Sequence, residues 1–553
     1  MLKESIRKYV LENAIKHEGR AAIGSVIGKL INEDPSVKNK LKDISKEIAS
    51  VINEVNKLSI NKQTEELRDI APELLEKREK QEHVLKELPN VSGRVVMRFA
   101  PFPSGPLHIG NARTAILNDE YCKKYKGKLL LVMDDTIGSE EKQIDKDAYS
   151  LIPDGLKFLN VKYENKIIYK SDRLGLYYKH AEELIKKNKA YVCSCSSETI
   201  RGNRKNGNEC SCRKLSIEEN KKRWKLMFDK KTKEGSYVLR IKTSMQDKNP
   251  AFRDRVLFRI SERKHPRVGN KYRVWPLLEF SWAVDDHLLG ITHVIRGKDL
   301  MMESEMEKYI WNIFGWKPSE ILHNGLLSLE GAKISKSKSA KEVKTGTYLG
   351  WDDPRTWSLQ SLKRRGIEAE AIRTFLMQFG LNQNEVTAPI DGLYSENRKL
   401  IEKDANRYFF IEKPVKIKIT NLPKELKTAK IPLHPDYLKR GFREIKVTDE
   451  FYVSDKIEKN KVYRFMHLFN FKDNKFISGK HDEKLDAKMI HWLPIDNLVN
   501  AEILMEDGSI IKGLAEPDVK NIKIDQIVQF ERQFFARCDN KEKDKMVFWF
   551  THK

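Results

Sequence analysis

The stretch of sequence that decides the fold covers residues 95–135 and reads VVMRFAPFPSGPLHIGNARTAILNDEYCKKYKGKLLLVMDD. It opens with an apolar run of strand length, which leads into a loop rich in Pro and Gly. A helix is predicted from Asn111 and ends at Gly127, and a second apolar strand over 129–133 ends in two aspartates. Strand, loop, helix and strand in this order form the unit of a parallel sheet. Because ligands bind beyond the carboxyl ends of such strands, both the loop and the aspartates are candidate site residues.

Segments of different character flank this stretch. Residues 1–92 are predicted to be helical, because apolar residues recur there at steps of three and four. The α/β alternation is interrupted over 191–273 and then resumes, with one strand predicted over 321–328. After residue 414 short runs alternate with period two, which indicates a barrel or a sandwich. The predicted parts are an N-terminal helical domain, a first catalytic half, an insertion, a second catalytic half, a helical connecting subdomain and a C-terminal β region, at 1–92, 93–190, 191–274, 275–345, 346–413 and 414–553.

The composition favours a polyanionic partner. Lys and Arg number 104 against 80 Asp and Glu, which gives a net charge of +24. Such an excess favours nucleic acid, because basic side chains displace counterions from phosphates. A solvated, Lys-rich surface would produce the same number, so charge alone does not decide. No stretch approaches the ~20 apolar residues of a membrane span, and the N-terminus lacks the apolar core of a signal peptide. We therefore expect a cytoplasmic protein with no membrane partner.

Two loops carry residues suited to a nucleoside triphosphate. In the first, His108 and Gly110 precede a helix N-terminus, where free backbone N–H groups favour phosphate and a glycine lets an adenine ring approach. In the second, Lys333 and Lys336 lie in a Gly- and Ser-rich loop over 330–339, where two cations can neutralise charge that develops on pyrophosphate. Read alone, the first loop is equally consistent with a turn around a structural histidine. The second, read alone, is equally consistent with a solvated basic loop.

Four of the six cysteines form two close pairs, Cys193 with Cys195 and Cys210 with Cys212. Paired thiolates in a large intracellular chain point to metal rather than disulfides. Four protein ligands suit a closed, tetrahedral, structural Zn²⁺ site. Four unligated thiols are the alternative. Basic residues around the pairs are suited to phosphate contacts, and they are Arg201, Arg204, Lys205 and Arg213.

Taken together, the two loops resemble the paired signatures of a known enzyme class. His108-Ile-Gly-Asn111 resembles the HIGH signature, and Lys333-Ile-Ser-Lys-Ser337 the KMSKS signature, of class I aminoacyl-tRNA synthetases, in the same order. The segments 98–110, 284–297 and 351–355 are similar to the glutamyl and glutaminyl subgroup. The helical N-terminal segment and the C-terminal barrels look like its archaeal branch, so the resemblance covers nearly the whole chain.

This resemblance implies an architecture and an activity. The architecture is a Rossmann-type α/β catalytic domain interrupted by a zinc-containing acceptor-binding domain, with an N-terminal helical domain and C-terminal β-barrels that bind the anticodon. The activity is ATP-dependent ligation of L-glutamate to tRNA(Glu) through glutamyl-adenylate, with Mg²⁺ beside the ATP. Whether tRNA(Gln) is a second acceptor stays open. We expect a monomer.

The resemblance also assigns roles to residues of this chain. The side chains expected to stabilise the phosphates during catalysis are those of His108, Lys333 and Lys336. The ATP-binding residues are expected to be Pro101, Gly105, His108, Gly110, Asn111, Lys333, Ser335 and Lys336.

A glutamate pocket must neutralise two carboxylates and one ammonium, because an unpaired buried charge is costly. Two arginines and one acid would do this. By resemblance, the amino acid is expected to contact Arg98, Ala100, Asp134 and Arg296. In the glutaminyl family a small uncharged residue is typical at the position of Arg296, which makes this arginine the sharpest discriminator. The alternative is that Arg296 is a structural residue paired with Asp285 or Asp286.

Three positions depart from the pattern of the family. Asn111 replaces the last histidine of the HIGH signature, Phe102 stands where a small or polar residue is usual, and Leu278 stands where relatives often have a substrate-contacting tyrosine. Phe102 and Leu278 bear on the fine details of the amino-acid pocket and not on the ATP chemistry, and the amide of Asn111 can still donate hydrogen bonds. Other hypotheses are a glutaminyl-tRNA synthetase, a tRNA-modifying relative that glutamylates a base, and a tRNA-binding paralogue without catalysis. The glutaminyl enzyme is disfavoured by Arg296, and the tRNA-modifying relative by the β structure after residue 414. The paralogue without catalysis is disfavoured by the intact His108, Lys333 and Lys336.

Overall fold

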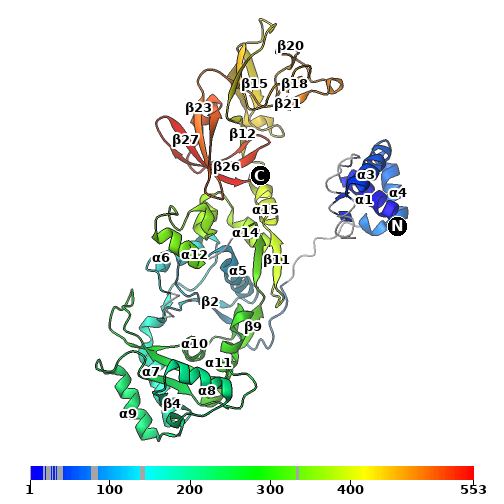
Figure 1. Cartoon of the computed structure of the whole chain (residues 1–553). Helices are drawn as coiled ribbons and strands as arrows, with labels where there is room; N and C mark the ends of the chain where they lie inside the picture. The colour runs from blue at the N-terminus through cyan, green and yellow to red at the C-terminus, as the bar shows by residue number, and fades with distance from the viewer. Residues whose placement is uncertain are drawn as a thin grey trace. The chain divides into compact units, whose positions relative to one another are not determined.

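The computed structural model describes residues 2–16, 19, 21, 26–27, 29–30, 33, 41–75, 85–137, 143–331 and 336–553. The chain divides into two compact units, Met1–Val84 and Leu85–Lys553, which are described separately (Figure 1). Within the described ranges, no helix is long and apolar enough to cross a membrane.

The first unit is helical, as predicted for its described part. It contains α1 (Leu2–Lys16), α3 (Leu41–Val55) and α4 (Ile60–Ile70). Apolar residues three or four apart face one core, for example Ile6, Val10 and Ala14 of α1. Gln63 is fully buried, and its side-chain nitrogen donates to the backbone carbonyls of Gly19, Val55 and Leu58.

A five-stranded parallel sheet organises the second unit. The strand order is β3-β2-β1-β8-β9, and every pair of neighbours is parallel. The strands are β3 (Ile168–Tyr169), β2 (Lys128–Met133), β1 (Val96–Phe99), β8 (His293–Gly297) and β9 (Glu320–Asn324). Between β1 and β2 runs α5 (Ile109–Lys124) (Figure 1). The predicted strand–loop–helix–strand unit is thereby confirmed, although the helix begins two residues before Asn111.

One strand prediction is wrong. The run over 321–328 is not one strand but the end of β9 and the start of β10 (Leu327–Glu330), which pairs with β11 (Val386–Pro389) in a separate sheet. The strand ends before Gly325, where a Cβ would lie 1.9 Å from the carbonyl oxygen of Asn384. Only a glycine permits that approach of two backbones.

Further helices lie between and after the strands of the parallel sheet in the sequence. Their bounds are α6 (Ala148–Phe158), α7 (Leu174–Lys186), α10 (Leu278–Leu288), α11 (Met301–Phe314), α12 (Lys336–Lys344), α13 (Leu359–Arg364), α14 (Ala369–Met377) and α15 (Asp391–Ile401). Helix α10 packs on α11, and α14 packs on α5 and α15. The interruption predicted between the sheet halves is a four-stranded antiparallel sheet, β4 (Ala190–Cys193), β5 (Val238–Ile241), β6 (Val256–Ile260) and β7 (Val274–Pro276), with α8 (Ser197–Asn206) and α9 (Ile217–Phe228).

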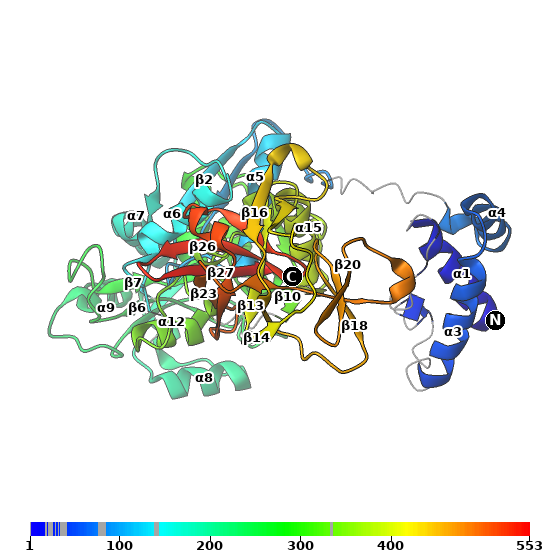
Figure 2. The same cartoon turned by 90° about the horizontal axis from the view of Figure 1, so that it is seen from above.

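The C-terminal region is β structure, as predicted. Its largest sheet has seven strands in the order β12-β25-β26-β27-β23-β24-β13. Figure 2 shows β23 (Val499–Leu504), β27 (Lys545–His552) and β26 (Phe534–Lys541) side by side. The remaining strands of that sheet are β12 (Asn406–Tyr408), β13 (Phe410–Glu412), β24 (Ile510–Ala515) and β25 (Ile527–Phe530).

Smaller sheets lie between β13 and β23 in the sequence. They comprise β14 (Val415–Lys418), β15 (Thr428–Pro432), β16 (Phe442–Lys446), β17 (Glu450–Val453), β18 (Val462–Phe465), β19 (Asn470–Lys472), β20 (Lys475–Ser478), β21 (Lys488–Ile490) and β22 (Leu493–Pro494). Their apolar side chains share one core, which includes Phe451, Phe465 and Trp492. Alternation with period two in the sequence therefore corresponds here to strands with one buried face.

Candidate active site

The loop after β1 is held in place by His108. This residue is the N-cap of α5, and its Nδ1 accepts a hydrogen bond from the backbone N–H of Gly110 at 3.1 Å. In a neutral imidazole whose Nδ1 is an acceptor, the proton lies on Nε2. His108 can therefore donate from Nε2. A Cβ at position 110 would lie 2.9 Å from Cε1 of His108, so the glycine makes room for this ring as well as for any ligand.

A cavity of about 1050 Å³ opens beside His108, beyond the carboxyl end of β1. Of the predicted ATP-binding residues, Pro101, His108 and Asn111 line it, together with Phe102. The other lining side chains that bear on the chemistry are Asp145, Lys341, Lys344 and Trp351. The buried Oδ1 of Asn111 has no hydrogen-bond partner among the described residues, so a ligand donor could complete it.

The backbone and the packing at position 105 both require a glycine. Its φ of +138° is in the region that favours glycine, and a Cβ there would lie 2.8 Å from the ring of Trp351. The indole N–H of Trp351 donates to Oδ2 of Asp145 at 3.1 Å. The loop after β1, the segment before α6 and the segment after α12 are thus brought together at one wall of the cavity.

The second predicted loop reaches the same cavity through its helix. Lys333 and Ser335 lie outside the described residues, and the backbone of Lys336 begins α12. Further along α12, Lys341 and Lys344 line the cavity that His108 also lines. His108 and the two lysines of α12, more than 200 positions apart in the sequence, therefore line the same cavity.

A second cluster lies around Trp282 and contains the predicted amino-acid ligands. Arg98 donates to both carboxylate oxygens of Asp286, with its Nη2 2.9 Å from Oδ2. Arg296 donates to both oxygens of Glu307, at 2.6 and 2.9 Å, and lies 3.9 Å from Asp286. All these side chains are buried. Arg296 thus has a buried acid as its main partner, and that acid comes from α11 rather than from the Asp-Asp pair of α10.

Asp134 completes this cluster, which we call the Trp282 cluster: Arg98, Asp134, Lys170, Trp282, Asp286, Arg296 and Glu307. The Nζ of Lys170 forms an ion pair with Oδ1 of Asp134 at 3.1 Å and donates to Oγ of Ser281 at 2.9 Å. Burial lowers the pKa of Lys170, and Asp134 and Asp285 oppose that effect. Neither oxygen of Asp134 has a hydrogen bond of good geometry within the described part of the chain. Ala100, half-buried, directly follows β1.

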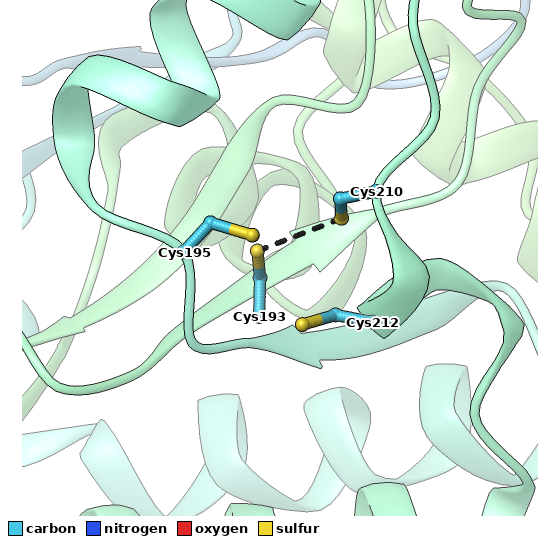
Figure 3. A group of neighbouring side chains, drawn as sticks. All are labelled: Cys193, Cys195, Cys210 and Cys212. Atoms are coloured by element: carbon cyan, nitrogen blue, oxygen red, sulfur yellow. Dashed lines mark hydrogen bonds between the residues drawn. The ribbon is translucent and has the colours of Figure 1, made fainter.

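The four paired cysteines converge (Figure 3). Their sulfur atoms all lie within 4.8 Å of one another, and Sγ of Cys193 and Sγ of Cys210 are 3.8 Å apart. Four sulfurs bound to Zn²⁺ at ~2.3 Å would be ~3.8 Å apart, so the donor set and its spacing fit a tetrathiolate site. The hydrogen bond from Cys193 lowers the pKa of the Cys210 thiol to about 5. Arg240 lies 3.9 Å from Sγ of both cysteines and would offset thiolate charge.

The basic residues near the cysteines do not form one surface. Arg204 donates to the carbonyl of Ala251, and Arg213 pairs with Asp254, so both are used within the insertion. Arg201 and Lys205 are exposed. Arg204 and Arg213 are half-buried, and phosphate contact stays a prediction for all four residues.

Comparison with known proteins decides the family. Residues 94–403 match the family model described as tRNA synthetases class I (E and Q), catalytic domain, and residues 405–490 and 452–539 match its two anti-codon binding domains. The chain belongs to this synthetase family. The glutamate–tRNA ligase of Methanocaldococcus jannaschii is 41% identical, and that of Methanothermobacter thermautotrophicus 39% identical, each over the whole of both chains.

A solved structure from the same family is more distant. The crystal structure of a glutamate tRNA ligase from Elizabethkingia meningosepticum, in complex with its amino acid, aligns with a TM-score of 0.41 and 19% identity. It covers 57% of this chain and 71% of its own. For this synthetase, the full-length relatives are therefore the informative comparison.

Several residues that line the cavity or belong to the Trp282 cluster were not found from the sequence. Asp145 and Trp282 belong to no motif, and nothing in their spacing marks them. Lys341 and Lys344 carry a weak signal, because they stand three residues apart on the helix that continues the second loop. Glu307 lies on α11 and Arg296 on β8, 11 positions apart, so the pair depends on how α11 packs and could not be predicted from local sequence.

Proposed function

We propose that this protein ligates L-glutamate to tRNA(Glu), using ATP and passing through glutamyl-adenylate. The observation that carries the proposal is the convergence of His108 and α12 on one cavity at the carboxyl end of β1. The relatives named glutamate–tRNA ligase, which match over their full length, favour glutamate over glutamine. The parallel sheet with its ligand cavity supports a Rossmann-type assignment of the catalytic region.

In the first step, the α-carboxylate of glutamate attacks the α-phosphorus of ATP and pyrophosphate leaves. No general base is needed, because the nucleophile is already ionised. Catalysis then consists of positioning and of stabilising the charge that develops on the phosphates. His108 donates from Nε2 to a phosphate oxygen, and Lys333 and Lys336 neutralise the leaving group. Mg²⁺, when bound beside the ATP, would supply further positive charge against the phosphates.

Binding of ATP is assigned to the loop after β1 and to the second loop. The proposed contacts are Pro101, Gly105, His108, Gly110, Asn111, Lys333, Ser335 and Lys336. Lys341 and Lys344 add positive charge to the same cavity. The proposed domain boundaries are those predicted from the sequence, with the anticodon read by the region after residue 414.

Binding of glutamate is assigned to Arg98, Ala100, Asp134 and Arg296. Support comes from Asp134, a buried carboxylate whose Oδ1 pairs with Lys170 at 3.1 Å and whose Oδ2 has no hydrogen bond in the described structure. An ammonium group would supply the missing donor. Arg98 and Arg296 lie on neighbouring strands of the sheet and both approach Trp282, so one substrate carboxylate could meet both.

The cysteines are proposed to hold a structural Zn²⁺. Cys193, Cys195, Cys210 and Cys212 would occupy all four tetrahedral positions, so no site would be left for a substrate. The ion would fix the loop before α8 against the turn that carries Cys210 and Cys212. Its chemical contribution is the rigidity of the insertion, which we assign to binding of the tRNA acceptor end.

In the second step, the terminal adenosine of tRNA attacks the carbonyl carbon of the adenylate, and AMP leaves. We assign the attack to the 2′-OH. The proposed partners are tRNA(Glu) and L-glutamate, with the protein acting as a monomer, and tRNA(Gln) as a second acceptor is a further hypothesis. Charging of separate tRNA(Glu) and tRNA(Gln) transcripts tests it.

Pyrophosphate exchange tests the activity. Purified protein is incubated with ATP, labelled pyrophosphate, and either glutamate or glutamine, with and without tRNA(Glu). We expect exchange with glutamate and tRNA, and at least a hundredfold less with glutamine. A further hypothesis, from the resemblance to the family, is that glutamate is activated only when tRNA is bound. Exchange with glutamate in the absence of tRNA would reject that hypothesis. Exchange with glutamine but not with glutamate would reject the proposed function.

A further inference from the structure

A single buried indole lies against three cations in the Trp282 cluster. The ring centroid of Trp282 is 4.9 Å from the guanidinium carbon of Arg98, 4.4 Å from that of Arg296 and 5.0 Å from Nζ of Lys170. The three cations come from β1, from β8 and from the turn after β3. The negative face of an aromatic ring attracts each of them, most strongly where water is absent. Trp282 is 5% exposed, so the ring is in position to hold these cations together.

The acidic side chains of the cluster neutralise its buried arginines, but some buried polar atoms of the cluster have no hydrogen-bond partner among the described residues. Asp286 pairs with Arg98, and Glu307 pairs with Arg296. Three buried atoms have no hydrogen bond among the described residues: the indole N–H of Trp282, the Nε–H of Arg296 and Oδ2 of Asp134, whose Oδ1 pairs with Lys170 at 3.1 Å. Buried polar groups are nearly always hydrogen-bonded in folded proteins. Two donors and one acceptor in the same cluster therefore indicate a ligand that carries both carboxylate and ammonium.

The helix that carries Trp282 fixes its relation to the arginines. Trp282 and Asp286 are four residues apart on α10 and so lie on the same face of that helix. Asp286 holds Arg98, and the ring one turn earlier contacts the same arginine. The indole ring thus has a fixed place against two guanidinium groups, and Lys170, the third cation at the ring, is a donor as well.

We propose that Trp282 determines specificity for the amino acid, by donating its indole N–H to the side-chain carboxylate of glutamate. The inference rests on the proposed function and extends it to a residue outside the recognised motifs. A carboxylate offers only acceptors and satisfies the indole and guanidinium donors together. The NH₂ of glutamine would face these donors without an acceptor, and sites of this kind discriminate strongly. The ring also positions Arg98 and Arg296.

The test compares Trp282→Phe with Trp311→Phe. Phe at 282 keeps an aromatic face for the cations but removes the N–H. Trp311 is the matched control, because it is buried on the neighbouring helix and its N–H donates to the backbone carbonyl of Ala283 at 2.8 Å. Glutamate and glutamine charging of tRNA(Glu) is measured for both variants and the wild type, with KM for glutamate, KM for ATP and kcat.

We expect Trp282→Phe to raise KM for glutamate about tenfold to a hundredfold, because a hydrogen bond to a charged group is lost. KM for ATP should change less than twofold, and the preference for glutamate over glutamine should fall. Trp311→Phe should leave all three unchanged. An unchanged KM for glutamate in Trp282→Phe, or an equal rise in both variants, would overturn the proposal. A wild type that does not charge glutamate would instead overturn the proposed function.

A measurement on the wild type covers the case in which Trp282→Phe does not fold. The nine tryptophans give nine indole N–H signals in a spectrum of ¹⁵N-labelled protein. With tRNA and a non-hydrolysable ATP analogue present, addition of glutamate should shift one of these signals, as expected when an unpaired N–H gains an anionic acceptor. If none of the nine moves, the proposal is wrong.

Discussion

His108 combines two roles in one ring, and substitution can separate them. Its Nδ1 caps α5, while Nε2 is the proposed phosphate donor. An asparagine at 108 keeps a side-chain oxygen that can cap the helix but has no donor at the position of Nε2. We expect His108→Asn to lower the rate of pyrophosphate exchange by a factor of about 10² to 10³ with little change in stability. His108→Ala should lose the same activity and also about 1 kcal/mol of stability. If His108→Asn catalysed pyrophosphate exchange at the wild-type rate, the ring would act only as a helix cap.

His552 should make stability depend on pH. Burial lowers its pKa to about 4, whereas an unfolded histidine titrates near 6.5. Between these values the unfolded chain binds more protons, so the contribution is fully present above pH 6.5 and is lost as pH falls toward 4. Replacement by Gln removes this contribution. The stability difference between wild type and His552→Gln should therefore shrink by about 2 kcal/mol from pH 7.5 to pH 5 in urea unfolding. A difference that does not change with pH would contradict this assignment.

At the residue scale, charged residues of the Trp282 cluster could be predicted from the sequence, but the residues that pair with its arginines could not. Arg98, Asp134 and Arg296 were found from the chemistry of glutamate and from the resemblance, and the structure gathers them in one cluster. Their partners could not be predicted, because Asp286 and Glu307 reach them only through the packing of α10 and α11. Trp282 was missed because a buried tryptophan in an apolar helix usually indicates core packing.

At the scale of elements, the cysteine-rich insertion makes the clearest prediction. If a structural Zn²⁺ holds β4 and the turn before α9 together, the purified protein should contain one zinc per chain, and a strong chelator should lower its thermal stability. Cys212→Ser should reduce zinc content and reduce tRNA charging more than pyrophosphate exchange. Cys538→Ser is the matched control, since that buried thiol lies in β26, outside the cluster. Zinc-free protein with normal stability and charging would contradict a structural metal.

Element prediction succeeded where the local pattern was decisive. The apolar runs and the Gly/Pro loop of residues 95–135 specified β1, α5 and β2. Asp507-Gly508, a dipeptide typical of hairpin turns, joins β23 to β24. Element prediction failed over 321–328, where the pattern is continuous but the backbone must turn at Gly325 to pass residues 383–384. That requirement comes from a segment about 60 positions away, so no local signal could have revealed it.

At the scale of the whole molecule, family and architecture could be predicted together because the motifs occur in a fixed order. The family match covers residues 94–403, and the anticodon-binding matches reach residue 539. The first unit, Met1–Val84, lies outside those matches but within the full-length relatives. Its helices could be predicted from periodicity, whereas a role could not, because its described residues carry no recognisable ligand-binding pattern.

The identity of the amino acid attached to tRNA tests the central claim most directly. Purified protein is incubated with tRNA(Glu), ATP, and glutamate and glutamine at equal concentration. The charged tRNA is then digested with nuclease, and the aminoacyl-adenosine is identified by mass spectrometry. We predict glutamyl-adenosine as the dominant product, formed only when ATP is present. Glutaminyl-adenosine as the dominant product, or no aminoacyl-adenosine from protein that binds tRNA, would contradict the account.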